Sequence, residues 1–229
     1  MERGLRFAES AGCILLLAVM ALCAWTGTER TAVIAAAAAL PALVPFIVRA
    51  EKKMLRARDV TVPVVLTALA CAGRVLFASI PNFMPTSAII IMGALVFGAD
   101  CGLLCGMLTG LVSNLLLGLG PYVPWQMLAW GLMGLAAGRL GEKTCGKIGT
   151  VPVCLFAFIA SVLYGVMLDG YHVLSFIRPL TLQTAAAGFV SGMLFNLVHA
   201  FSSVIFTLLG WPLWQKRLLR IRQKFELLH

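Results

Sequence analysis

The feature that most constrains this chain is the length of its stretches without a charged residue. The longest of these stretches runs from Cys101 to Gly138, and six other long uncharged stretches lie between charged residues elsewhere in the chain. About 20 apolar residues cross the hydrocarbon core of a bilayer. The apolar residues are continuous rather than alternating, so they predict membrane-spanning helices and not the strands of a barrel. Because 61% of the residues are hydrophobic and only 12% are charged, a water-soluble domain of this size is excluded.

The uncharged stretches predict eight helices. Glycines and prolines divide the longest stretch into two, and a proline pair at 81 and 85 ends an earlier one. The expected helices cover residues 10–28, 31–49, 60–80, 86–99, 102–117, 124–139, 149–169 and 183–210. The expected fold class is therefore an all-α polytopic membrane protein. Residues 1–58 form an extra hairpin with a basic linker, residues 59–212 form a six-helix core, and residues 213–229 form a basic tail.

The positions of lysine and arginine predict the topology. With eight spans, 15 of the 18 basic residues lie on one side, within residues 3–6, 49–58, 139–147 and 216–224. Arg30 and Arg178 lie on the other side, and Arg74 lies inside a span. Because cytoplasmic loops carry the excess of lysine and arginine, we expect both termini in the cytoplasm. The net charge of +9 then reflects orientation and contact with lipid headgroups, and we expect no nucleic-acid partner.

A break in the longest uncharged stretch is the strongest candidate for a site. Between Asn114 and Met127, two glycines and two prolines stop the helix, and amide or aromatic side chains lie on each side. The predicted topology places this break on the outer face, together with loops 81–85 and 170–180. The polar and aromatic residues expected there are Asn82, Phe83, Tyr122, Trp125, Gln126, Tyr171, His172 and Arg178, beside Asp169. This layout favours capture of a solute from outside.

Individual residues of this cluster also have structural explanations. Arg74, expected about a turn and a half below the outer end of its helix, either snorkels to the headgroups or contacts the solute or Asp169. Asn114 either joins two helices by a hydrogen bond or binds the solute. Tyr122 and Trp125 are either interfacial aromatic residues or part of the site.

Several common functional motifs are absent from the sequence. It has no phosphate-binding Gly-x-x-x-x-Gly-Lys-Ser/Thr, no His-Glu-x-x-His, no Gly-x-Ser-x-Gly and no paired carboxylates. The seven cysteines lie mostly inside apolar stretches and are interpreted as packing residues, so no metal site is expected. We therefore expect neither an enzyme nor a self-powered pump, and transport would need energy from another subunit.

From about Val60 onward the chain resembles the substrate-binding S components of energy-coupling factor (ECF) vitamin transporters. The residues that carry the resemblance are Ala68-x-x-x-Ala72, Arg74 before the segment 81–85, and Ser113-Asn114 leading to the segment 120–127. The resemblance implies a vitamin-like solute, a transmembrane scaffold subunit and two ATPase subunits. ATP would be used by those partners, and this chain would bind no cofactor. The expected location is the bacterial cytoplasmic membrane.

The resemblance also implies roles for particular residues. Ala68 and Ala72 would contact the scaffold. The solute would lie under the outer loops, near Asn82, Asn114, Tyr122, Trp125 and Gln126. The segment 114–127 most resembles S components assigned to cobalamin, which makes cobalamin the expected solute. The alternatives are another vitamin or nucleobase-like solute, of the queuosine precursor, riboflavin or pyridoxine class, and a structural membrane protein that transports nothing.

Overall fold

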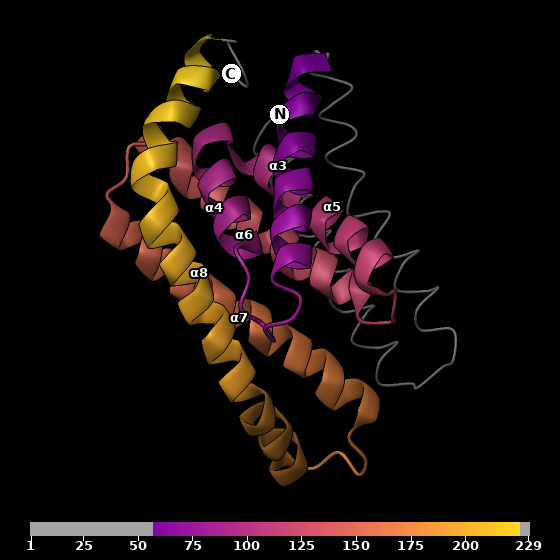
Figure 1. Ribbon diagram of the computed structural model, residues 1–229. Helices are drawn as coiled ribbons and strands as arrows, with labels where there is room; N and C mark the ends of the chain where they lie inside the picture. The colour runs from indigo at the N-terminus through magenta and orange to yellow at the C-terminus, as the bar shows by residue number, and fades with distance from the viewer. Residues whose placement is uncertain (1–56, 225–229) are drawn as a thin grey trace, which may run out of the picture.

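The computed structural model describes residues 57–224, and this part of the chain is entirely helical apart from short connections. Its six helices are α3 (Ala57–Leu76), α4 (Thr86–Phe97), α5 (Ala99–Leu117), α6 (Val123–Thr144), α7 (Thr150–Phe176) and α8 (Leu182–Lys224). Figure 1 shows them as a bundle in which α7 and α8 form a long hairpin that extends beyond the other helices. The predicted hairpin 10–28 and 31–49 and its linker lie outside the described residues.

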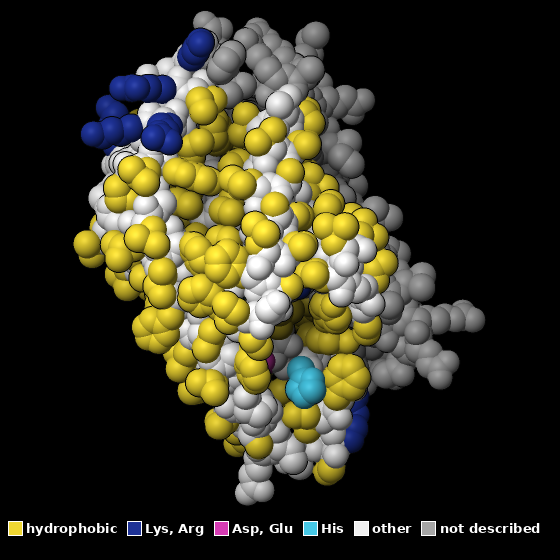
Figure 2. All heavy atoms as spheres, in the orientation of Figure 1, with side chains coloured by type: hydrophobic (Ala, Val, Ile, Leu, Met, Phe, Trp, Pro, Cys, Tyr) yellow, Lys and Arg dark blue, Asp and Glu magenta, His cyan; other side chains and the backbone are white. Residues whose placement is uncertain are grey.

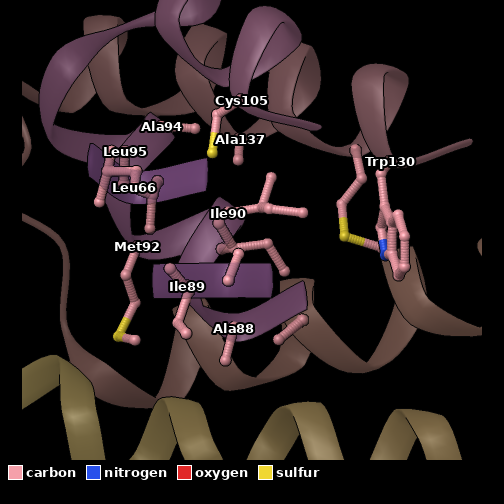
Figure 3. Close-up of a cluster of buried hydrophobic side chains, with 14 of the residues drawn as sticks. Leu66, Ala88, Ile89, Ile90, Met92, Ala94, Leu95, Cys105, Trp130 and Ala137 are labelled. Atoms are coloured by element: carbon pink, nitrogen blue, oxygen red, sulfur yellow. The ribbon is translucent and has the colours of Figure 1, made fainter. Parts of the chain in front are cut away.

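Helix α4 is the centre of the bundle. All twelve of its residues are buried, which fits a helix that is apolar on every side. Leu66 of α3 packs over Gly93, and Met92 reaches toward Gly210 of α8. Figure 3 shows this core, with side chains of α4 directed both toward α8 and toward its other neighbours. At about 1.5 Å per residue α4 is about 18 Å long, shorter than the hydrocarbon core of a bilayer.

Helices α5 and α6 are joined along a seam of glycines. A Cβ atom at Gly102, Gly106 or Gly134 would overlap backbone atoms of the facing helix. Gly110 likewise faces the backbone of Met127. Small residues of this kind let two backbones approach closely inside a membrane. The seam holds the C-terminal part of α5 in a definite register against the start of α6, and both parts contribute to the candidate site.

The two ends of the bundle differ in charge. The end of α6, the start of α7 and the end of α8 lie together at one end, called here the basic end, where lysine and arginine side chains gather (Figure 2). The connections 77–85, 118–122 and 177–181 lie at the opposite end, called here the distal end. This separation agrees with the charge distribution predicted for residues 139–147 and 216–224. The distal end remains the predicted outer side.

Three described helices, α5, α7 and α8, are long and apolar enough to cross a membrane, and α3 and α4 contain shorter apolar segments. Large hydrophobic side chains are exposed along α7 and α8, among them Leu155, Leu163, Leu194 and Leu208. In a bilayer these faces would contact lipid rather than water. The coarse prediction of a polytopic helical membrane protein is therefore confirmed for the described part of the chain.

Several predicted helix boundaries were wrong. Helix α3 ends at Leu76 rather than at residue 80, so Arg74 lies in its last turn. Helix α7 continues to Phe176 rather than ending at 169, because Gly170 is tolerated inside a helix that packs on α8. Helix α8 continues past Pro212 to Lys224, since the residues beyond the proline still pack on the basic end. Tyr171 and His172 therefore lie on a helix and not in a loop, and Asp169 lies within the helix rather than at its end.

Candidate solute-binding site

Arg74 directs its guanidinium group into the bundle at the distal end. Its Nη1 donates hydrogen bonds to Oγ of Ser113 and, at 3.1 Å, to Oδ1 of Asn114. Its Cζ lies 5.1 Å from the centroid of the Trp130 ring, which is completely buried. A cation over an aromatic face is stabilised by the ring quadrupole. The guanidinium group is therefore held between α5 and α6, and it does not snorkel to the headgroups.

Asn114 and Gln126 form the buried centre of a hydrogen-bond network. The Nδ2 of Asn114 donates to Oε1 of Gln126 and to the carbonyl oxygen four residues before it, while its Oδ1 accepts from Arg74 and, at 3.4 Å, from Tyr122. Gln126 in turn donates through Nε2 to the hydroxyl of Tyr164 at 2.6 Å. The amide of Asn114 has two donors and an oxygen with two lone pairs, and all are used. The side-chain amide of Asn114 is therefore engaged by protein partners through both its nitrogen and its oxygen.

An aromatic stack lies beneath Arg74. The rings of Trp130 and Tyr164 stack with centroids 5.0 Å apart, and the rings of Tyr164 and His199 lie 4.9 Å apart. The indole Nε1 of Trp130 donates to Oγ of Ser87 at 3.0 Å, and the same hydroxyl is 2.9 Å from Nε2 of His199. Offset stacking and a satisfied indole N–H both favour a fixed ring orientation. These contacts fix the side chains that lie beneath the guanidinium group of Arg74, and these side chains come from α4, α6, α7 and α8.

The connection between α3 and α4 is attached to α8. His199 Nδ1 lies 3.3 Å from the carbonyl oxygen of Asn82, and Ser202 Oγ both donates to the carbonyl oxygen of Met84 at 3.0 Å and accepts from its N–H at 2.8 Å. Asn82 has a φ of 57°, a left-handed conformation that asparagine tolerates better than most residues. Phe83 packs between Phe77 and Phe206. The side chain of Phe83 therefore packs against other aromatic rings and holds the α3–α4 connection against α8.

Tyr122, Trp125 and Gln126 follow the break between α5 and α6. Trp125 and Gln126 lie in the first turn of α6, inside the predicted helix 124–139, because Pro124 occupies a position near the helix start where its missing N–H costs nothing. The single O–H of Tyr122 is shared between the carbonyl oxygen of Gly118, at 3.0 Å, and Oδ1 of Asn114, at 3.4 Å. Trp125 packs against Tyr171 of α7 with ring centroids 5.8 Å apart. This pair forms an aromatic wall beside the partly exposed Tyr122.

Asp169 and His172 do not join the Arg74 network. Oδ2 of Asp169 accepts a hydrogen bond of 2.6 Å from Asn196 of α8, and the carboxylate lies over Gly192, where a Cβ atom would overlap it. The ring of His172 lies beside Phe176, with centroids 5.5 Å apart. The contact between Arg74 and Asp169 that was considered from the sequence is therefore not made. The acid instead joins the two helices of the long hairpin.

The face drawn in Figure 2 is hollowed at the distal end. Figure 2 shows hydrophobic side chains lining the recess, with an acidic and a histidine side chain at its rim. The network around Arg74 and the wall of Trp125 and Tyr171 belong to the same end of the bundle. The recess is the candidate point of entry for a solute.

The sequence did not identify Trp130 and Tyr164 as members of the site. Both lie in the middle of apolar stretches, where an aromatic residue is usually part of the core. A weak signal was available, because Trp130 lies four residues after Gln126 and therefore on the same face of α6. His199, interpreted from the sequence as a hydrogen-bonded packing residue, is 2% exposed and has the hydrogen bonds described above.

Two other predictions concern metals and partners. Within residues 57–224 no group of three or more histidine, cysteine, aspartate and glutamate residues could hold a metal ion. Cys71, Cys101 and Cys105 are buried thiols. Ala68 and Ala72 both lie on the exposed face of α3, one helical turn apart, on the side away from the buried Leu66 and Ala70. This face is accessible to another protein within the membrane.

Comparison with known proteins identifies the family. The family model described as "ECF-type riboflavin transporter, S component" matches residues 54–215, which is most of the chain. No curated protein and no solved structure gives a significant match. S components are the substrate-specific membrane subunits of ECF transporters, they work with scaffold and ATPase subunits, and they are not enzymes. The chain belongs to this family and is a substrate-specific membrane subunit of an ECF transporter.

Proposed function

We propose that the chain captures a vitamin-like solute with a flat heteroaromatic ring, of the riboflavin class, at the distal end and from outside the cell. The observation that carries this proposal is the convergence of Arg74, Tyr122 and the aromatic rings of α6 and α7 at that end. Such rings offer apolar faces to a flat solute, while the guanidinium and hydroxyl groups supply directional hydrogen bonds. The solute is then delivered inward with the scaffold and ATPase subunits.

Within the site, the proposal separates residues that touch the solute from residues that support them. Arg74 and Tyr122 are partly exposed and are proposed as direct contacts, with Trp125 and Tyr171 as the adjacent wall. Asn114 and Gln126 are 0% and 4% exposed, and their amides are engaged with protein partners. They are proposed to orient the contact residues.

The riboflavin class is preferred to cobalamin as the solute. The segment 114–127 resembles cobalamin S components, but the matching family is described by riboflavin and gives no support to cobalamin. A flat ring also suits the spacing of the aromatic side chains better than a bulky macrocycle, since Trp125 and Tyr171 are already packed against each other. Cobalamin is therefore an outcome of the test and not the proposal.

The scaffold is proposed to dock on the exposed face of α3. Ala68 and Ala72 form a small-xxx-small pair there, which lets two membrane helices approach closely. Substitution of Ala68 by leucine is expected to reduce co-purification with the scaffold. Ala136→Leu is the matched control, because Ala136 is an exposed alanine on α6. Equal loss of the scaffold in both variants would argue against α3 as the docking helix.

The experiment that tests the function is identification of the ligand retained by the purified chain, by mass spectrometry, followed by binding measurements with riboflavin and cobalamin without ATP. We expect riboflavin to bind to the isolated chain, and uptake by cells to require co-expression of the scaffold and ATPase subunits. Binding of cobalamin but not riboflavin would overturn the proposed solute class. No retained ligand and no binding across a vitamin panel would favour a structural membrane protein instead.

A further inference from the structure

We infer that the solute presents an oxyanion, a phosphate or a carboxylate, to the Nε–Nη2 edge of Arg74. This inference rests on the proposed function, because it names the chemical group that the same site selects. A solute of this kind is a flat vitamin-like ring with an acidic substituent, and the acid rather than the ring is what the guanidinium recognises.

The described part of the protein does not neutralise the charge of Arg74. Both acceptors of its Nη1, the hydroxyl of Ser113 and the amide oxygen of Asn114, are neutral groups. No carboxylate forms a salt bridge with Arg74 within residues 60–224. Asp169 is engaged by Asn196, and Glu142 accepts a hydrogen bond from the N–H of Ala99 at the basic end. A charged side chain inside a membrane bundle is costly unless something compensates it.

One edge of the Arg74 guanidinium group makes no hydrogen bond to the described residues. Within the described residues every hydrogen bond of Arg74 uses Nη1, which leaves the N–H groups of Nε and Nη2 without a protein acceptor. These two groups lie parallel in the plane of the guanidinium and match the two oxygens of a carboxylate or phosphate. Arg74 is only partly buried, and we infer that this edge is the part that a solute reaches from the distal end.

Protein contacts orient the guanidinium group of Arg74 before a solute binds. Trp130 supports its face at 5.1 Å, and Ser113 and Asn114 hold Nη1. Asn114 is itself held by Gln126, which is held by Tyr164. Because these residues come from α5, α6 and α7, the arginine loses little conformational freedom when an anion binds. A surface arginine that only contacts headgroups would not need this support.

A phosphate could also come from a lipid headgroup, because Arg74 lies near the distal end. The interior direction of the side chain, over a ring that is 0% exposed, favours the solute as the source. The experiment therefore compares two ligands with the same ring, riboflavin and riboflavin 5′-phosphate, which differ only in the phosphate. Binding is measured by quenching of flavin fluorescence, in phosphate-free detergent buffer and again in phosphatidylcholine nanodiscs.

We expect riboflavin 5′-phosphate to bind at least about tenfold more tightly than riboflavin in both settings, as a charge-assisted bidentate pair implies. Arg74→Met should remove this preference. Arg74→Lys should retain part of it, because lysine keeps the positive charge but lacks the two parallel N–H groups of a guanidinium. Arg178→Met is the matched control for general attraction of anions, since Arg178 is the other arginine at the distal end of the described part of the chain, and this variant should retain the preference. Thermal unfolding of each variant excludes loss of the fold as the cause.

Each remaining outcome counts against the inference in a different way. Equal affinity for the two flavins in wild-type protein would overturn the inference and leave the proposed function standing. A preference that exists in detergent but disappears in phosphatidylcholine nanodiscs would mean that lipid phosphate occupies Arg74, which also overturns it. A preference that survives in Arg74→Met would assign the phosphate to another residue. Binding of neither flavin would overturn the riboflavin class together with the inference.

Discussion

The glycine seam between α5 and α6 leads to a quantitative prediction about Gly110. A Cβ atom at this position would lie 2.8 Å from the Cα and 2.9 Å from the N of Met127, whereas ordinary contacts of a Cβ begin at about 3.4 Å. The obstacle is backbone, so Gly110→Ala must push the two helices apart by about 0.6 Å, a gap that forfeits roughly a quarter of the dispersion energy of the affected contacts. Overpacking of this kind costs about 1–3 kcal/mol.

The same displacement should reach the candidate site. The carbonyl oxygen of Gly110 accepts a hydrogen bond from Asn114, and Met127 follows Gln126, so the amide pair between the two helices must lengthen. We therefore expect Gly110→Ala to lower both the thermal stability and the affinity for the solute. The stability is measured by thermal unfolding of the purified chain in detergent, and the affinity by flavin fluorescence.

Gly170→Ala is the matched control for this prediction. Gly170 also lies inside a helix, but a Cβ atom there would meet nothing within 4 Å. Alanine should therefore stabilise the chain by about 0.5–1 kcal/mol, because it restricts the unfolded state and favours the helix. If Gly110→Ala unfolds at the wild-type temperature or above it, the reasoning about a rigid seam is refuted.

Three further predictions concern individual contacts. Asn114→Leu leaves the buried oxygen of Gln126 without its donor, which should lower stability by about 1–3 kcal/mol and weaken solute binding, as measured by thermal unfolding and fluorescence. His199→Phe keeps an aromatic ring but removes the polar contacts to Ser87 and to the α3–α4 connection. Proteolysis should then cut that connection faster, and an unchanged rate would show that these contacts do not hold it in place. Gln215→Leu removes two hydrogen bonds to loop carbonyls at the basic end and should lower stability by about 1–2 kcal/mol without affecting solute affinity.

The sequence predicted the spans well because apolar length and charge are local properties. Runs without charge and the Gly–Pro break at 118–124 marked the helices, and the basic residues separated the two ends. The boundaries of α7 and α8 were less predictable. A helix continues through Gly170 or Pro212 only when its neighbours stabilise it, and those neighbours are distant in sequence.

The site was predicted in part. Asn114, Tyr122 and Gln126 lie close together in sequence on both sides of the break, and the structure brings them into one network. Asp169 and His172 were assigned to the same outer cluster because the predicted topology places them at the same depth in the membrane. Depth alone cannot tell whether two side chains face each other, and Asp169 is turned toward Asn196 on α8. Whether these residues bind a solute stays a prediction.

The sequence by itself determined the class of the protein and the number of apolar segments in the core, and it predicted the end of the bundle at which a solute enters, since these depend on composition and on the order of charges along the chain. Only the tertiary structure decided the direction of Arg74, the burial of Asn114 and Gln126, and the participation of Trp130 and Tyr164. The physical reason is that the orientation of a buried polar group depends on which partners satisfy it. Here Arg74 and its acceptor Ser113 are 39 residues apart along the chain, and Gln126 and its acceptor Tyr164 are 38 residues apart.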